Sequence, residues 1–435
     1  MRGSIIISGV ALGAALFAST PARAQLVDRQ IFDAGVDNGL LDSVVVTMGD
    51  RLAFFANKDA SLGADDFLWV SDGTAAATVP IAAVPGGALL HPVAACSTFV
   101  LVSSGDETFR SDGTEAGSLS LGVVAADSAV CVGAHMFFLA GDALFVTDGT
   151  VAGTAQLSDV NHTLTSAGNA GASCFDINAA QRCGLAALPN GVVLFPGTSD
   201  DEGAELWRTD GTDAGTALVA DIIPGAAGLK PKSLFASGDR IFGTTDDGGL
   251  FVSDGSAAGT AVVASGGLTL AAASPALGGL IFGATIDQSL QAFFTDGTAI
   301  TQITSFANVN ALASFLPLGT DRGFFEIDAG SSNPANGMYV TDGTASGTEH
   351  FVIVDGCASE CEAAGGTVFC GCGDAALGRV LLLGTDGTVT GTQFLNLTLG
   401  VHGMASIGGS LIYEAAQPTD LGIVSQQLRI ALGSC

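Results

Sequence analysis

Residues 204–225 read AELWRTDGTDAGTALVADIIPG, and this stretch decides the fold. The segment begins as an apolar strand and reverses at Asp210-Gly211, because glycine accepts a positive φ and aspartate bonds its own downstream amides. A second strand-like run, TALVADII, then ends at Pro224-Gly225, since proline cannot donate to a continuing ladder. The segment therefore predicts a β-hairpin.

The same phrase, an apolar strand running into Ser/Thr-Asp-Gly-Thr/Ser, returns eight times along the chain. Successive aspartates are 40, 36, 62, 44, 42, 46 and 44 residues apart; they are Asp72, Asp112, Asp148, Asp210, Asp254, Asp296, Asp342 and Asp386. Another pair of strand-like runs lies upstream of each hairpin, as in SLFAS and DRIFGT between residues 233 and 244. Four strands in a period of about 45 residues, without helical patterning, are typical of a propeller blade.

The two ends of the chain bear on the number of blades. After the eighth Asp-Gly-Thr unit, GMASIGGSLIYEAA and QQLRIALG supply three strand-like runs, and LVDRQIF at residues 26–32 offers a fourth. Pairing the termini would close the ring and remove a long unpaired edge. We therefore expect an all-β fold, a β-propeller of eight or nine four-stranded blades, nine if the termini share a blade. An open linear stack of β units ranks third.

The first 24 residues have the organisation of a secretory signal peptide. A cationic start precedes an apolar run at residues 5–18, and the small-residue pattern Ala-Arg-Ala ends at residue 24. The apolar run is too short for a typical membrane span. We expect removal of residues 1–24 and a single β-propeller domain at residues 25–435, located outside the cytoplasm: secreted, periplasmic or at the cell surface.

The chain is strongly acidic, with 43 acidic and 14 basic residues and a formal net charge of −29. Such a surface repels phosphate backbones and anionic headgroups, because binding them requires clustered lysine and arginine. Nucleic acid is therefore excluded as a partner, and no membrane insertion is expected. The acidity is best explained by the solubility of a chain with 61 glycines, and cation binding is the alternative.

Nine cysteines in an exported chain predict disulfides. Cys174 and Cys183 lie in the longest gap between repeats, which suggests an inserted loop with its own bridge. The cluster CASEC…CGC could instead hold zinc, but Cys-x-Cys is an unusual knuckle and export favours oxidation. Connectivity stays open, and Cys435 is the best candidate for the odd thiol. The cysteines expected in disulfides are Cys96, Cys131, Cys174, Cys183, Cys357, Cys361, Cys370 and Cys372.

Each repeated aspartate precedes glycine in a hairpin, so its carboxylate is expected to satisfy local backbone donors. We assign these residues a structural turn role and assign no catalytic residue, metal ligand or cofactor. A peripheral Ca²⁺ ion stays open near acidic stretches at residues 65–66, 200–205 and 246–247, none of which has the order of a calcium loop. The strand-borne phenylalanines expected between blades are Phe54, Phe55, Phe137, Phe138, Phe324 and Phe325.

The fourth copy also resembles a known repeat. Its phrase Glu-Leu-Trp-x-x-Asp-Gly-Thr at residues 205–212, with the tail Asp-Ile-Ile-Pro-Gly at residues 221–225, is similar to the ELWxxDGT repeat family of secreted bacterial proteins. Other copies depart from it: tryptophan stands only at Trp69 and Trp207, and Ser256 replaces one threonine. The resemblance extends over about the whole chain after residue 24. It implies an extracytoplasmic, propeller-like protein without established catalytic residues.

Two classes of function remain. The first is an exported, non-catalytic β-propeller that acts, as a monomer, as a binding or surface-interaction module for protein or glycan, since near-identical repeats lack the asymmetry of catalysis. The second is a secreted hydrolase or lyase with its site in the propeller channel. Titratable side chains that converge at the axis would favour the enzyme. We expect specificity where the repeat fails, around Cys174 and Cys183 and between Cys357 and Cys372.

Overall fold

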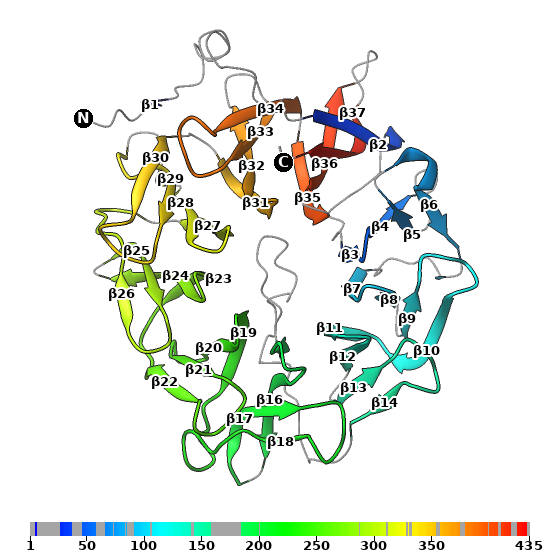
Figure 1. The fold of residues 1–435 in the computed structure, drawn as a ribbon, viewed down its shortest axis with the longest axis vertical. Helices are drawn as coiled ribbons and strands as arrows, with labels where there is room; N and C mark the ends of the chain where they lie inside the picture. The colour runs from blue at the N-terminus through cyan, green and yellow to red at the C-terminus, as the bar shows by residue number, and fades with distance from the viewer. Residues whose placement is uncertain are drawn as a thin grey trace.

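The part of the chain that the structure describes folds into a ring of nine β-sheets (Figure 1). The computed structural model describes residues 5–6, 27–36, 46–57, 66–72, 74–82, 84, 91–104, 107–140, 143–157, 184–199, 201–286, 288–309, 312–327, 329, 333–353, 357–374, 379–398, 400–407, 410–418 and 424–432. Apart from a short 3₁₀ helix at Ala75–Ala77, the regular elements in these residues are strands. Each sheet is one blade of a β-propeller.

The first eight blades each use four strands that follow one another in sequence. Blades one to three are β3 (Val46–Met48), β4 (Arg51–Asn57), β5 (Asp66–Ser71) and β6 (Val79–Ile81); β7 (His91–Ala95), β8 (Val100–Ser104), β9 (Glu107–Ser111) and β10 (Ser118–Val124); β11 (Ala126–Val132), β12 (His135–Ala140), β13 (Ala143–Thr147) and β14 (Ala155–Gln156). Blades four to six are β15 (Ala186–Ala187), β16 (Val193–Ser199), β17 (Gly203–Thr209) and β18 (Ala217–Leu218); β19 (Pro231–Ser237), β20 (Arg240–Thr245), β21 (Leu250–Ser253) and β22 (Ala261–Ala264); β23 (Leu270–Ala276), β24 (Gly279–Ile286), β25 (Ser289–Thr295) and β26 (Ile300–Gln302). Blades seven and eight are β27 (Leu312–Leu318), β28 (Arg322–Ile327), β29 (Gly337–Thr341) and β30 (Glu349–Ile353); β31 (Cys357–Ala364), β32 (Thr367–Asp374), β33 (Arg379–Thr385) and β34 (Gln393–Thr398).

The ninth blade is made from both ends of the chain. β35 (Gly400–Ile407), β36 (Ser410–Pro418) and β37 (Val424–Leu432) supply three strands, and β2 (Val27–Val36) pairs antiparallel with β37. The ladder joins the two ends of the ring, as the colours of β2 and β37 show in Figure 1. The expected sharing of one blade by the termini is therefore confirmed, and the ring has nine blades.

A further short strand lies at the outer edge of the seventh blade. β1 (Ile5–Ile6) pairs in parallel with β30 and gives this sheet its fifth strand. It belongs to the segment expected to be removed, and the blade has its four strands without it. The rest of residues 1–24 lies outside the described residues.

Paired phenylalanines explain why neighbouring blades pack together. Phe137 lies in one buried cluster with Phe195 and Trp207 of the fourth blade, whereas the next residue, Phe138, lies in another with Phe99 of the second. Successive side chains on a strand point to opposite faces of the sheet, so a Phe-Phe pair serves both neighbouring blades at once. Phe324 and Phe325 divide in the same way between the eighth and sixth blades. The expected inter-blade packing is confirmed for these four; Phe54 is buried, and the side chain of Phe55 lies outside the description.

The turns of the ring fall on two faces. Because consecutive strands alternate in direction, the turns between first and second strands and between third and fourth strands of the first eight blades lie on the same face. This face carries the Asp-Gly-Thr turns, and we call it the repeat face. The other face, which we call the linker face, carries the turns between second and third strands and the links from one blade to the next.

Two disulfides are fully described. Cys96–Cys131 joins the second and third blades, and Cys361–Cys370 joins β31 to β32. Cys372 is also disulfide-bonded, and the ladder places Cys357 opposite it. In these bonds the cysteine sulfurs are paired with one another, whereas the zinc alternative requires them as free thiolates. The remaining cysteines, Cys174, Cys183 and Cys435, lie outside the described residues.

The acidic chain has no membrane-spanning helix in its described part. There, no helix combines the length and the hydrophobicity needed to cross a bilayer.

Candidate functional site

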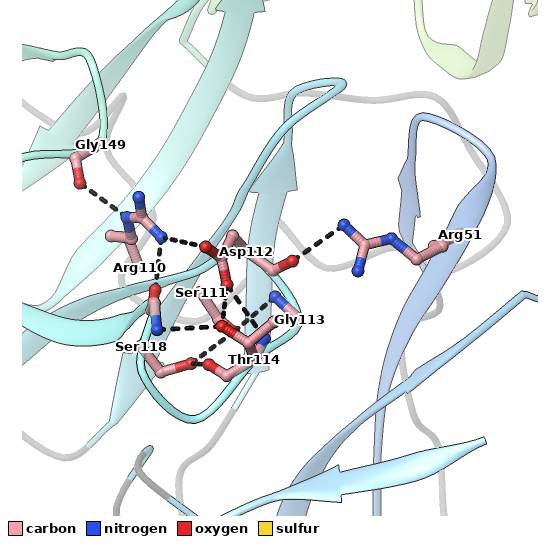
Figure 2. Close-up of polar contacts among 9 residues, drawn as sticks. Arg51, Arg110, Ser111, Asp112, Gly113, Thr114, Ser118 and Gly149 are labelled. Carbon is pink, nitrogen blue, oxygen red and sulfur yellow. Dashed lines mark hydrogen bonds and ion pairs between the residues drawn. The ribbon is translucent and has the colours of Figure 1, made fainter. Parts of the chain in front are cut away.

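The second blade shows what the repeated aspartate does (Figure 2). Asp112 Oδ1 accepts hydrogen bonds from the backbone N–H of Thr114 at 3.0 Å and from the Thr114 hydroxyl at 2.7 Å. The Thr114 hydroxyl oxygen accepts from the N–H of Gly117 at 3.0 Å, and the Ser118 hydroxyl donates to the Thr114 carbonyl at 2.7 Å. The carboxylate therefore organises the first half of its own turn.

The residue before the aspartate closes the second half of the turn. Ser111 Oγ lies 2.7 Å from Ser118 Oγ and accepts from the N–H of Gly113 at 3.1 Å. The same hydroxyl pair, seven residues apart, recurs as Ser71 with Thr78, Thr147 with Thr154, Thr209 with Thr216, Ser253 with Thr260, Thr341 with Thr348 and Thr385 with Thr392. The working motif is therefore Ser/Thr-Asp-Gly-Thr/Ser-x-x-Gly-Ser/Thr, with the second glycine replaced by Ala77 in the first copy.

All eight repeated aspartates use Oδ1 in this way, accepting from the backbone and the hydroxyl of the residue two positions on. Hydrogen bonds to the charged form stabilise it, so in six of these turns the threonine or serine hydroxyl and N–H hold the carboxyl pKa below its usual value. This lowered pKa applies to Asp72, Asp148, Asp210, Asp254, Asp296 and Asp342. The structure thus places each aspartate in a turn of a separate blade and brings none of them together.

The second position of glycine in the motif is explained by lack of space for a side chain. Gly215 lies against the carboxylate of Asp210, and a Cβ at this position would overlap the carboxylate atoms. In the first copy, Ala77 stands here within the 3₁₀ helix, and its N–H still reaches the Thr74 hydroxyl at 3.3 Å. In the sixth copy, Thr301 stands at the position of this glycine and belongs to strand β26.

Arginines connect these turns from blade to blade. Arg51, at the start of β4, donates to the carbonyl of Asp112 in the next blade at 2.9 Å, and Arg110 donates to the carbonyl of Gly149 at 2.7 Å (Figure 2). Equivalent bonds run from Arg208 to Gly255, from Arg240 to Asp296 and from Arg322 to Asp386. Five of the 14 basic residues therefore serve the contacts between blades of the repeat face.

Two carboxylates of the acidic stretches considered for Ca²⁺ form local hydrogen bonds. Glu202 accepts a hydrogen bond from the Ser199 hydroxyl, and Asp247 Oδ1 accepts from the Thr245 hydroxyl at 2.5 Å. Among the described residues, the one group of three close metal-ligating atoms is Glu326 with Cys361 and Cys370. Those two cysteines form a disulfide, which leaves a single carboxylate and no metal site there.

The innermost strands carry few ionisable groups. Of the described side chains on these strands, Lys232 and Glu362 are titratable apart from the cysteines. Burial raises the pKa of Glu362 to about 7, although Ser406 of the ninth blade hydrogen-bonds to it. Among the side chains that the structure describes on these strands, Glu362 is therefore the one carboxyl.

Glu205, the leading residue of the fourth copy, organises a loop of the linker face. The side chain is fully buried, and its Oε1 accepts from the N–H groups of Ile223 at 3.0 Å and Leu229 at 2.9 Å. Its Oε2 has no hydrogen-bond partner among the described residues. Burial raises the pKa of this carboxyl, because removal from water penalises the charged form.

Gln291 does the same work at the equivalent position of the sixth copy. Its Oε1 accepts from the N–H of Phe306 at 2.8 Å and from the Thr304 hydroxyl at 3.1 Å, while its Nε2 donates to the Phe306 carbonyl at 2.8 Å. Buried Glu205 and buried Gln291 therefore each anchor the link from their blade to the next. Glu107 occupies the same position in the second copy, but it is exposed.

The roles of the buried anchors Glu205 and Gln291 and of the arginines that join blades were not predicted from the sequence. One available signal was the leading Glu205 together with the Asp-Ile-Ile-Pro-Gly tail that it bonds. Another was the repeated Asp-Arg at the start of second strands, at Arg51, Arg240 and Arg322.

The strand topology of the described residues, with nine blades, defines the class of the protein as a β-propeller. No protein-family model matches the chain, and no curated protein sequence matches it. Three of the similar solved structures are a computationally designed protein, Ika8 (13% identity, TM-score 0.42, 76% of this chain and 93% of that one), puromycin hydrolase (15%, 0.45, 88% and 60%) and BamB from Moraxella catarrhalis (12%, 0.40, 92% and 100%).

Proposed function

We propose that the mature chain is an exported, non-catalytic binding module that acts as a monomer and presents loops of a rigid ring to a protein or glycan. One observation carries this proposal: the Oδ1 atom of every repeated aspartate accepts hydrogen bonds within its own turn. The most regular polar feature of the molecule is therefore architectural. Binding residues in rigid folds are commonly found on irregular loops, which here lie on the linker face.

The cellular location and family are part of the same proposal. Disulfides such as Cys96–Cys131 support a location outside the cytoplasm, since reducing compartments keep such thiols free. The Glu-Leu-Trp-x-x-Asp-Gly-Thr phrase supports membership of the ELWxxDGT repeat family. The proposal includes no bound cofactor, with Ca²⁺ as the ion to test.

The test uses residues 25–435 immobilised on beads, a glycan array and a pull-down from secreted proteins, each with and without a chelator. We expect saturable retention of a protein or glycan that the chelator leaves unchanged. Absence of any saturable ligand would contradict the proposal. Retention that disappears with chelator would instead indicate that the acidic loops bind a cation.

One observation favours a channel hydrolase or lyase as the second candidate. Glu362 lies on an innermost strand and has a pKa of about 7, near that of an effective general acid or base. Activity on glycoside and peptide substrates that is lost in Glu362→Gln would establish this candidate over the binding module.

A further inference from the structure

The loop that Glu205 anchors is an exposed apolar projection with a fixed backbone. Residues 223–227 are all exposed, and Ile223 retains 39% of its accessible surface. The N–H of Ile223 and that of Leu229 both bond the buried Glu205 carboxylate, which ties down the two ends of the projection. A loop fixed before binding loses less conformational entropy when a partner contacts it.

Two turns of the linker face contact this loop and extend its surface. The N–H of Lys230 bonds the carbonyl of Ala204 at 2.8 Å, and the N–H of Asp246 bonds the carbonyl of Lys230 at 3.2 Å. Residues 201–204, 221–230 and 245–248 therefore form one surface across the fourth and fifth blades. We call this surface the 223 patch.

The charges of the 223 patch are mostly negative. Asp201, Asp221, Asp246 and Asp247 are exposed in it, against one exposed lysine, Lys230. The chain as a whole carries a net charge of −29, so the field around the patch attracts cations. An apolar centre with an acidic surround is complementary to a basic protein segment that carries an apolar side chain.

We propose that the 223 patch docks a partner protein through a basic segment with an apolar anchor, which contacts Ile223 and Pro224 between the surrounding carboxylates. This inference rests on the proposed binding function and names its surface and its class of partner. The apolar contact fixes how the partner segment is aligned on the patch. The carboxylates increase the association rate and attract the basic side chains of the segment.

The probe is a fluorescein-labelled peptide of alternating lysine and leucine, and its negative control is the same peptide with glutamate in place of lysine. Anisotropy with residues 25–435 should show saturable, salt-sensitive binding of the lysine peptide alone. Ile223→Asp adds a negative charge, so purely non-specific attraction would be unchanged or stronger. We expect it instead to weaken binding about tenfold, equivalent to about 1.4 kcal/mol, because the apolar anchor is lost.

Val262→Asp is the matched control, because Val262 is 40% exposed on the outer strand β22 of the fifth blade. It adds the same charge in place of an equally exposed apolar residue, and binding should change less than twofold. Thermal melts should show both variants folded. Binding of Ile223→Asp that matches wild type, equal losses in both variants, or no binding of the lysine peptide would each overturn the assignment.

The outcomes separate the two proposals. A natural ligand that Ile223→Asp retains as well as wild type leaves the binding-module proposal standing and removes the 223 patch. Failure of wild type to retain any protein or glycan removes both.

Discussion

The repeat face and the linker face are built from the same blades but use their polar groups differently. On the repeat face, an aspartate and two or three hydroxyls satisfy one another within each turn, and arginines join one turn to the next. On the linker face, a buried side chain such as Glu205 or Gln291 holds a link whose own sequence is not repeated. Regularity therefore marks the architecture of this ring, and irregular loops on buried anchors mark its candidate for recognition.

The largest effect that sharpens this contrast is expected at the linker-face anchor. Glu205→Ala leaves the buried N–H of Leu229 and the partly buried N–H of Ile223 without their acceptor, which should cost about 3 kcal/mol of unfolding free energy. Glu205→Gln is the matched control, since Gln291 performs this role in the sixth copy and an amide oxygen still accepts. Chemical denaturation of both variants measures the difference. Equal stability of Glu205→Ala and wild type would show that the link needs no anchor.

The next effect compares one glycine from each face. Gly215→Ala places a Cβ against the Asp210 carboxylate on the repeat face, and we expect a loss of about 2 kcal/mol from overpacking. Gly225→Ala on the linker face meets open space and carries only the strain of its positive φ of 93°, about 1 kcal/mol. Urea unfolding of the two variants gives the comparison. A smaller loss at Gly215 than at Gly225 would contradict the steric account of the motif.

The arginine contacts should have a somewhat smaller effect. Arg110→Met keeps the length of the side chain but removes its bond to the Gly149 carbonyl and its ion pair with Asp112 at 3.5 Å. We expect a loss of about 1.5 kcal/mol, typical of a hydrogen bond from a charged donor. Lys232→Met, at an exposed site, serves as control and should change the unfolding free energy by less than about 0.5 kcal/mol. Similar losses in both would mean that general charge, rather than the contact between blades, is responsible.

The smallest effect is the pH dependence of a repeat-face turn. The Thr344 hydroxyl and N–H lower the pKa of Asp342 from 3.8, so the ionised carboxylate stabilises the fold above pH 3.8. This contribution is lost as the pH falls below 3.8 through the lowered pKa. Asp342→Asn keeps an acceptor oxygen but cannot ionise, so its stability deficit should shrink on acidification. Melting temperatures at pH 7 and pH 3 test this, and a deficit that grows in acid would refute the assigned charge state.

Much of the fold could be predicted because its information is local. The Asp210-Gly211 pair predicts a chain reversal, because glycine has the conformational freedom that a tight turn needs. The spacing between copies of this pair predicts the length of one blade. The terminal segment LVDRQIF was expected to complete a blade, and β2 does pair with β37. The Phe-Phe pairs followed from the alternation of side chains along a strand.

The anchors and contacts between blades were harder to predict because they join residues distant in sequence. Arg51 meets the Asp112 turn 61 residues later, and Glu205 meets Leu229 after 24 residues. Neither distance is visible as a motif, because it depends on how one blade packs on the next. The pairings Cys96–Cys131 and Cys361–Cys370 also had to be read from the structure.

The sequence by itself determined the blade, its turns and the expectation of oxidised cysteines, because hairpin chemistry and side-chain alternation act over a few residues. Only the tertiary structure decided that nine blades close through the two termini, that the repeated carboxylates stay apart, and that Glu205 is buried under an exposed loop. These features depend on ring closure and on the packing of neighbouring blades. The same Asp-Gly-Thr phrase that could have suggested a ring of reactive carboxylates is thus a set of separate, internally bonded turns.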